Sequence, residues 1–210
     1  MDLQEYIEQH ITPENEVLEH INHETQLTQA YAHMLSGHVQ GRLLSMLSHM
    51  IAPHRILELG TFTGYSALCL AEGLAVDGCL VTIEHNDEQE DIIRDNFSRS
   101  PLAQRIDLRI GDAKTIIPTL NTPFDLVFID ADKREYTTYY DLVFPLIPTG
   151  GYLLADNTLW DGHIIDPKYD KDPQTRGLRA FNDRIAVDTR VEKVILPIRD
   201  GLTLIRKLHP

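Results

Sequence analysis

The feature that most constrains this chain is an apolar run followed by two spaced glycines, RILELGTFTGYS over residues 55–66. A continuous apolar run is typical of a buried parallel strand, and glycines just past its end let the backbone approach a ligand at the start of the next helix. The segment therefore predicts a strand, a ligand-binding loop containing Gly60 and Gly64, and then a helix.

The glycine spacing indicates the kind of ligand. A dinucleotide fingerprint begins with G-x-G and needs a third glycine, whereas this loop has Phe62 and Tyr65 in its place. The pattern E-x-G-x-x-x-G suits a smaller zwitterionic nucleoside such as S-adenosylmethionine, whose ammonium or sulfonium group can face Glu58. A tight turn without a ligand is the alternative interpretation.

Strands and helices alternate from residue 55 onward, which is typical of a parallel α/β sheet with right-handed crossovers. We expect strands near 55–59, 79–84, 106–110, 124–130 and 150–156, and helices near 64–74, 87–99, 114–120, 136–146 and 174–187. Two extended runs, 191–198 and 202–207, flank an Asp-Gly turn and predict an antiparallel hairpin at the sheet edge. The expected fold is a doubly wound, Rossmann-like, mostly parallel seven-stranded sheet.

Two helices are expected before this core. Thr12 and Pro13 provide an N-cap and a first helical residue, so one helix is predicted from there to about Glu24. The second is predicted over 37–50. The link Met34–Ser36 between them is expected either to fold over the cofactor loop or to be a plain connector.

Length and composition limit the organisation of the chain. At 210 residues and 23.9 kDa the chain fits one domain, with a helical extension over 1–52 and the core over 53–210. Its formal net charge of −13 makes nucleic acid and anionic membranes poor partners and favours a small molecule or a metal ion. Two isolated cysteines, no signal peptide and no long apolar stretch lead us to expect a cytoplasmic protein.

Ligands of open α/β sheets bind beyond the carboxyl ends of the strands, so the residues there are candidates for a site. Glu84 lies at the end of the second strand, 24 residues after Gly60, close to the spacing at which an acid accepts hydrogen bonds from ribose hydroxyls. Asp112 follows the third strand, where it can bond an adenine amino group, cap the next helix, or do both.

Oxygen ligands gather at the ends of the fourth and fifth strands. Asp130 ends the expected fourth strand and Asp132 follows it, while Asp156 ends the expected fifth strand and Asn157 follows it. A set made of Asp130, Asp156 and Asn157 contains no His or Cys, so it favours a hard divalent cation, Mg²⁺ with Ca²⁺ or Mn²⁺ as alternatives, over Zn²⁺. Taken singly, Asp130 can be a helix cap and Asp156 part of a turn, but their convergence on one edge predicts a metal site.

Lys133 lies three residues after Asp130 and is expected near that cation. An ammonium group beside a divalent cation loses its proton more readily because like charges repel, which makes a neutral amine available as a general base. The alternative is a solvated lysine paired with Asp132 or Glu135. Spacing alone does not separate these interpretations.

The same residues resemble the cation-dependent class I O-methyltransferases, a family that includes caffeoyl-CoA and catechol O-methyltransferases. The resemblance covers about residues 34–207 and is greatest to bacterial relatives of the caffeoyl-CoA group. It is carried by MLSGHVQGRLLSML (34–47), RILELGTFTGYSALCLA (55–71), FDLVFIDADKREYTTYY (124–140), DNTLWDG (156–162) and PIRDGLTLIRK (197–207).

This resemblance implies roles for individual positions. Contacts to S-adenosylmethionine are implied for Glu58, Gly60, Ser66, Glu84, Ala113, Asp130 and Asp132, with Met34 and Ser36 lining the cofactor and metal site. Metal ligands are implied at Asp130, Asp156 and Asn157, a catalytic base at Lys133 next to Asp130, and an acceptor contact at Trp160. A homodimer is also implied. Gln40 stands where plant members tend to have an acid, and residues 163–174 differ from theirs.

The predicted reaction is transfer of a methyl group from S-adenosylmethionine to one hydroxyl of a vicinal aromatic diol that chelates the cation. Three alternatives remain. An NAD-dependent dehydrogenase is disfavoured by the missing third glycine, and a non-catalytic nucleoside-binding module by the acids, amide and lysine that occur together. RNA methylation is disfavoured by the acidic balance.

Overall fold

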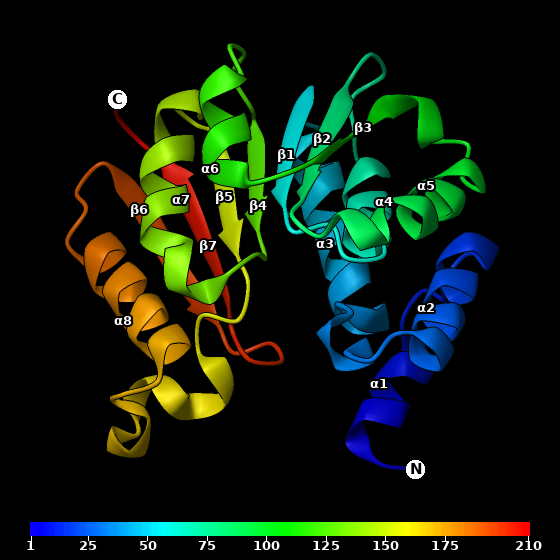
Figure 1. Cartoon of the computed structure of the whole chain (residues 1–210), viewed down its shortest axis with the longest axis horizontal. Coiled ribbons are helices and arrows are strands. Elements are labelled where there is room, and N and C mark those ends of the chain that lie inside the picture. The colour runs from blue at the N-terminus through cyan, green and yellow to red at the C-terminus, as the bar shows by residue number, and fades with distance from the viewer.

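The computed structural model describes residues 1–210 and contains one seven-stranded sheet with the strand order β3-β2-β1-β4-β5-β7-β6. Strands β1 to β5 run parallel, and β6 and β7 form an antiparallel hairpin at one edge (Figure 1). The strands are β1 (Arg55–Leu59), β2 (Cys79–Glu84), β3 (Ile106–Ile110), β4 (Leu126–Ile129), β5 (Tyr152–Ala155), β6 (Val191–Leu196) and β7 (Leu202–Lys207). The predicted Rossmann-like fold is confirmed.

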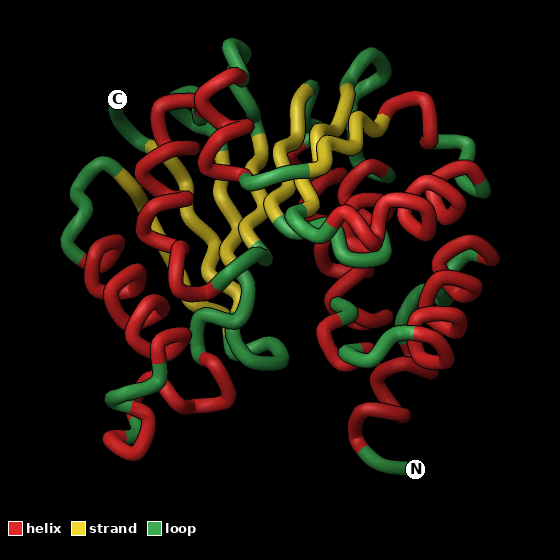
Figure 2. The backbone as a smooth tube through the Cα atoms, viewed as in Figure 1, coloured by secondary structure: helices red, strands yellow, loops and turns green.

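Helices cover both faces of this sheet, as Figure 2 shows in red around the yellow strands. One face carries α2 (Glu16–Thr28), α3 (Gly37–Ile51), α4 (Tyr65–Ala71) and α5 (Glu90–Ser98). The other carries α6 (Ala113–Ile116), α7 (Tyr136–Val143) and α8 (Pro173–Ala186). No helix has the length and apolar character that crossing a membrane requires.

Residues of the central strands alternate between the two apolar cores. In β1, Ile56 packs in the core under α3 and α4, whereas Leu57 and Leu59 pack in the core under α7. This alternation follows from the two-residue period of a strand. Glu58 therefore shares the face of Ile56 and is directed under α4, although it is a carboxylate in an apolar layer.

The N-terminal helices differ from the prediction in three respects, one of which is that the helix expected to end at about Glu24 continues to Thr28. The helix expected from Thr12 begins at Glu16, because the Asn15 side chain accepts a hydrogen bond from the Leu18 amide at 3.0 Å and caps the helix there. An additional helix, α1 (Leu3–His10), starts at a capping box made by Asp2 and Glu5. It buries no side chain, so no apolar stripe predicts it.

The strand order reverses next to β1, which pairs with β2 on one side and β4 on the other. Such a switch point opens a crevice beyond the carboxyl ends of the strands. Gly60 lies in this crevice with a φ of 95°, and a Cβ at this position would overlap the carbonyl group of Asp130. The ends of β1 and β4 are therefore as close as glycine permits.

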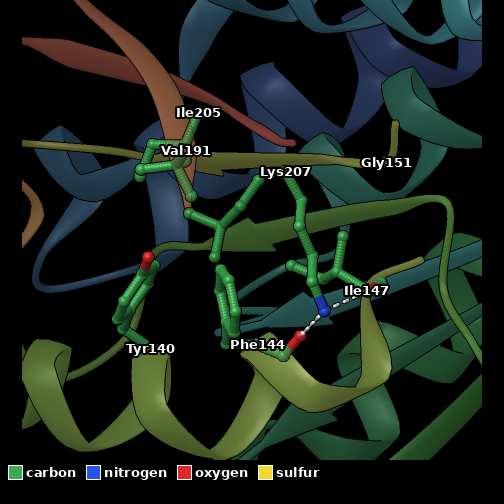
Figure 3. A pocket seen from close by; sticks show the side chains of 8 residues that line it. Tyr140, Phe144, Ile147, Gly151, Val191, Ile205 and Lys207 are labelled. Atoms are coloured by element: carbon green, nitrogen blue, oxygen red, sulfur yellow. Dashed lines mark hydrogen bonds between the residues drawn. The ribbon is translucent and has the colours of Figure 1, made fainter. Parts of the chain in front are cut away.

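A buried lysine fastens β7 to the end of the α7 segment (Figure 3). The Lys207 ammonium donates hydrogen bonds to the carbonyl oxygens of Phe144 and Ile147, at 2.9 and 2.7 Å. Burial lowers the pKa of Lys207. The space around its side chain has a free volume of about 0 Å³, so this region of the protein is packed core and not a ligand site.

Candidate active site

A cavity of about 1410 Å³ lies beyond the carboxyl ends of the parallel strands. Most of the predicted site residues line it: Met34, Ser36, Gly60, Ser66, Glu84, Asp112, Ala113, Asp130, Asp132, Lys133, Asn157 and Trp160. Glu58 and Asp156 do not, because both are buried behind its wall. The link Met34–Ser36 covers the cavity and is not a plain connector.

The loop after β1 is held in place by Glu84. One carboxylate oxygen of Glu84 accepts hydrogen bonds from the backbone amides of Thr61 and Phe62, at 3.1 and 2.8 Å. The other oxygen accepts from the Asn86 amide at 2.8 Å. Glu84 thereby fixes the glycine loop while it remains part of the cavity wall.

Glu58 supports the same loop from behind. Its two carboxylate oxygens accept hydrogen bonds from the hydroxyls of Ser66 and Thr82, at 2.6 and 2.5 Å. Burial raises the pKa of Glu58 from 4.5 to about 8, against the lowering effect of these two donors. In the structure Ser66 lies at the cavity and Glu58 accepts the Ser66 hydroxyl from behind, so a direct contact between Glu58 and the ligand stays a prediction.

Asp112 caps the helix that follows β3. Its side chain accepts a hydrogen bond from the Lys114 amide at 2.9 Å, at the start of α6. The residue also lines the cavity next to Ala113. The capping role is therefore present, and the contact to adenine stays a prediction.

Lys133 forms an ion pair with Asp130, with 2.7 Å between the Lys133 Nζ and an Asp130 carboxylate oxygen. The two alternative partners are engaged elsewhere. Asp132 pairs with Arg134, whose hydrogen bond lowers the pKa of Asp132, and Glu135 pairs with Lys114 at 3.3 Å. Only 12% of the Lys133 side chain is exposed, so this amine is enclosed by the site and is not a solvated lysine.

The residues after β5 lie beside Asp130. The Gln40 side chain donates a hydrogen bond to one carboxylate oxygen of Asp156 at 2.6 Å, and the backbone N–H of Asn157 donates to the other at 2.8 Å. Burial raises the pKa of Asp156 to about 7, and the negative charge of Asp130 contributes in the same direction. The side-chain nitrogen of Asn157 donates to Asp200 at 2.8 Å.

The donor chemistry of these residues fits a hard divalent cation. Asp130, Asp156 and Asn157 offer only oxygens, and the effect of Asp130 on the pKa of Asp156 shows a like-charge strain that a cation would relieve. The set consists of two carboxylates and an amide. Nowhere in the chain do three or more His, Cys, Asp or Glu side chains form a group that could hold a metal ion.

Sequence reasoning missed the contribution of the β6–β7 turn. Arg199, with a φ of 50°, donates hydrogen bonds to the carbonyl oxygens of Leu35 and Ser36 and so ties the turn to the segment that covers the cavity. The sequence indicated only a hairpin turn. The predicted hairpin is the only indication of this contribution. Its turn lies beside the end of β5 because Ala155 pairs with Thr203 in the antiparallel arrangement.

An aromatic wall follows Asn157. The His163 ring stacks on Tyr169 with 3.6 Å between centroids and meets the edge of Trp160 at 6.4 Å. Arg179 in α8 fixes this segment by donating hydrogen bonds to the Ile164 carbonyl and the Asp170 carboxylate, each at 2.7 Å. Trp160 and His163 both line the cavity.

Comparison with known proteins identifies the family. A model of the O-methyltransferase family matches residues 8–208. Tricin synthase 2 of Oryza sativa subsp. japonica is 36% identical over 190 residues, 85% of this chain, which spans only 65% of the rice protein. The catechol O-methyltransferase of Niastella koreensis is 35% identical over 174 residues, which are 79% of this chain and 78% of that protein.

A solved structure leads to the same family. The O-methyltransferase from Bacillus cereus in complex with SAH has a TM-score of 0.89 and 30% sequence identity, and the match covers 97% of this chain and 96% of that one. The chain therefore belongs to the O-methyltransferase family, as its resemblance to the caffeoyl-CoA and catechol enzymes predicts.

Proposed function

We propose that this protein transfers the methyl group of S-adenosylmethionine to one hydroxyl of a vicinal aromatic diol, with a divalent cation, Mg²⁺ foremost, at the diol. The position of Asp130 is the observation that carries the proposal. Its backbone touches Gly60 of the glycine loop, its carboxylate pairs with Lys133, and its charge acts on Asp156. One residue thus joins the donor loop, the base and the oxygen ligands.

The size of the cavity supports two ligands side by side. Its volume of about 1410 Å³ exceeds the roughly 300–1,000 Å³ of an ordinary small-molecule pocket. The glycine loop and Glu84 form one end of the wall, and Trp160 and His163 form another part of it. We assign the loop end to the nucleoside and the aromatic part to the acceptor.

The chain's own residues have separate roles in this reaction. Lys133 in its neutral amine form accepts the proton of the reacting hydroxyl, and the Asp130 carboxylate accepts a hydrogen bond from its Nζ and holds it in place. Trp160 limits the orientation of the acceptor ring, and holding reactants in line is worth about 7–11 kcal/mol at its limit. Asp130, Asp156 and Asn157 would hold the cation. When bound, the cation favours the ionised acceptor hydroxyl, and S-adenosylmethionine supplies the methyl group.

A screen by mass spectrometry tests the activity. The purified protein is incubated with S-adenosylmethionine, Mg²⁺ and a panel of catechols, hydroxycinnamates, their coenzyme A thioesters and flavonoids. We expect a product with one added methyl group, and none with excess EDTA or in Asp130→Ala. Turnover that survives both treatments would remove the metal from the proposal, and cofactor binding without any methylated diol would contradict the proposed reaction.

We also propose that the protein is a cytoplasmic homodimer. Large apolar side chains are exposed on several elements, among them Met46 and Met50 on α3 and Val194 and Ile195 on the edge strand β6. Both cysteines are free, as a reducing compartment would keep them. Light scattering after size-exclusion chromatography should give twice the monomer mass, and a monomer at all concentrations would contradict the dimer.

A further inference from the structure

The Asn157 side chain has two chemically different ends, and only one of them suits a cation. The amide oxygen is a ligand for hard ions, whereas the NH₂ group donates hydrogen bonds and repels a cation. The two ends exchange places by rotation about one side-chain bond. Unless something holds the nitrogen, both orientations are available to Asn157.

Asp200 holds that nitrogen. The Asn157 Nδ2 donates to an Asp200 carboxylate oxygen at 2.8 Å, and the Asn157 oxygen accepts no hydrogen bond from any protein group. Hydrogen bonds to an ionised acceptor are about twice as strong as neutral ones. The opposite orientation would place the amide oxygen against the Asp200 carboxylate, so that two acceptors would face each other.

Backbone hydrogen bonds around Asp200 hold it next to Asn157. Its carbonyl oxygen accepts hydrogen bonds from the amides of Leu159 and Trp160, at 2.8 and 2.9 Å, and Gly201 accepts from Thr158 at 3.0 Å. A Cβ on Gly201 would lie 2.6 Å from the Leu159 nitrogen, so the two segments are in close backbone contact. The turn therefore presents the Asp200 side chain to Asn157 from a rigid position.

We infer that Asp200 is a positioning residue that turns the carbonyl oxygen of Asn157 toward the cation. The inference rests on the proposed function, because it needs a cation between Asp130, Asp156 and Asn157. It adds a residue that acts on the cation through Asn157, and it gives the hairpin turn, whose Asp200 also lines the cavity, a role in metal affinity.

Binding of Mn²⁺ tests this, measured from the free-ion signal in electron paramagnetic resonance. Asp200→Ala should weaken Mn²⁺ binding by roughly 10–100-fold, which is the usual effect of removing a group that orients a metal ligand. Asp161→Ala is the matched control, because Asp161 lines the same cavity but makes no side-chain hydrogen bond or ion pair. It should change Mn²⁺ affinity only a few-fold.

Two more variants separate orientation from charge and folding. Asp200→Asn can still accept the Asn157 nitrogen, so it should bind Mn²⁺ within a few-fold of the wild type. Asn157→Asp has two equivalent oxygens that need no orientation, so adding it to Asp200→Ala should restore much of the affinity. Melting temperatures show whether each variant is folded. If Asp200→Ala is not, Asp200→Leu takes its place, because leucine is close to aspartate in size and accepts no hydrogen bond from Asn157.

The outcomes are distinct. Wild-type affinity in Asp200→Ala, an equal loss in Asp200→Asn, or no recovery with Asn157→Asp would each overturn the role of Asp200 while leaving the metal site standing. A wild-type protein that binds no Mn²⁺ would overturn the metal-dependent function as well.

Discussion

Replacing Gly60 by alanine tests the close approach of β1 and β4 at the site. Gly60 has a φ of 95°, and the added Cβ would overlap the Asp130 carbonyl group. Gly150 is a matched control, because it has a φ of 88° but no atom within 4 Å of its Cβ position. The two variants share the backbone strain, and only Gly60→Ala adds the overlap.

The expected loss of stability follows from the backbone strain and the steric overlap. An L-residue at positive φ costs about 1–2 kcal/mol, and the stiffer unfolded chain offsets about 0.4–1 kcal/mol of that. Gly150→Ala should therefore lose about 1 kcal/mol. Overpacking adds about 1–3 kcal/mol, and we expect the upper end at Gly60 because a backbone carbonyl cannot rotate away. At about 2–4 °C per kcal/mol for a chain of this size, Gly60→Ala should melt roughly 6–16 °C below the wild type.

Thermal unfolding followed by circular dichroism measures this difference, and isothermal titration with S-adenosylhomocysteine measures the consequence for the site. Only Gly60→Ala should weaken nucleoside binding, since the displaced Asp130 and the glycine loop both line the cavity. Equal losses of stability in the two variants, with equal nucleoside affinity, would refute the reasoning from close approach.

Three further predictions concern ionisable side chains. The pKa of Glu58 is raised from 4.5 to about 8, so its contribution to stability is full below pH 4.5 and is lost as the pH rises to about 8. The melting temperature of Glu58→Gln should therefore fall less than that of the wild type between these two pH values. Asp188 has a pKa lowered by its hydrogen bond from Arg190, so Asp188→Asn should cost about 2 kcal/mol at neutral pH in urea unfolding, and this difference should shrink as the pH falls below 3.8. Lys133→Ala should lower turnover by roughly 10²–10⁴-fold while S-adenosylhomocysteine affinity changes little, and an unchanged rate would argue against a base at this position.

The strands of the parallel core were predicted well from sequence, because an apolar run and the turn residues that close it are neighbours in the chain. The strands at 55–59, 79–84 and 106–110 have the predicted bounds, since each is an apolar run closed by turn residues. The start of α2 differs from the expected one because Thr12 and Asn15 are both good caps, and Asn15, which also donates a hydrogen bond to the distant Glu72, is the residue that caps the helix.

The site was predicted less completely, for a physical reason. Strand ends placed Asp130, Asp156 and Asn157 together, because the carboxyl ends of neighbouring parallel strands share one edge. The contacts of Gln40 and Asp200 with those residues are long-range hydrogen bonds, and no periodicity marks them. The burial of Glu58 follows from the alternation along β1, but its hydroxyl partners come from α4 and β2.

The bonds from Arg199 to Leu35 and Ser36 have a consequence for how the enzyme is made. They join groups more than 160 positions apart, so the cover of the cavity is anchored only after nearly the whole polypeptide has been synthesised. The N-terminal helices and the first strands can fold earlier, but without the last hairpin their covering segment is held only by the packing of Leu35 in the core and lacks the bonds from Arg199. A nascent or C-terminally shortened chain would therefore keep much of its sheet while its methyl-transfer chamber stayed open to water.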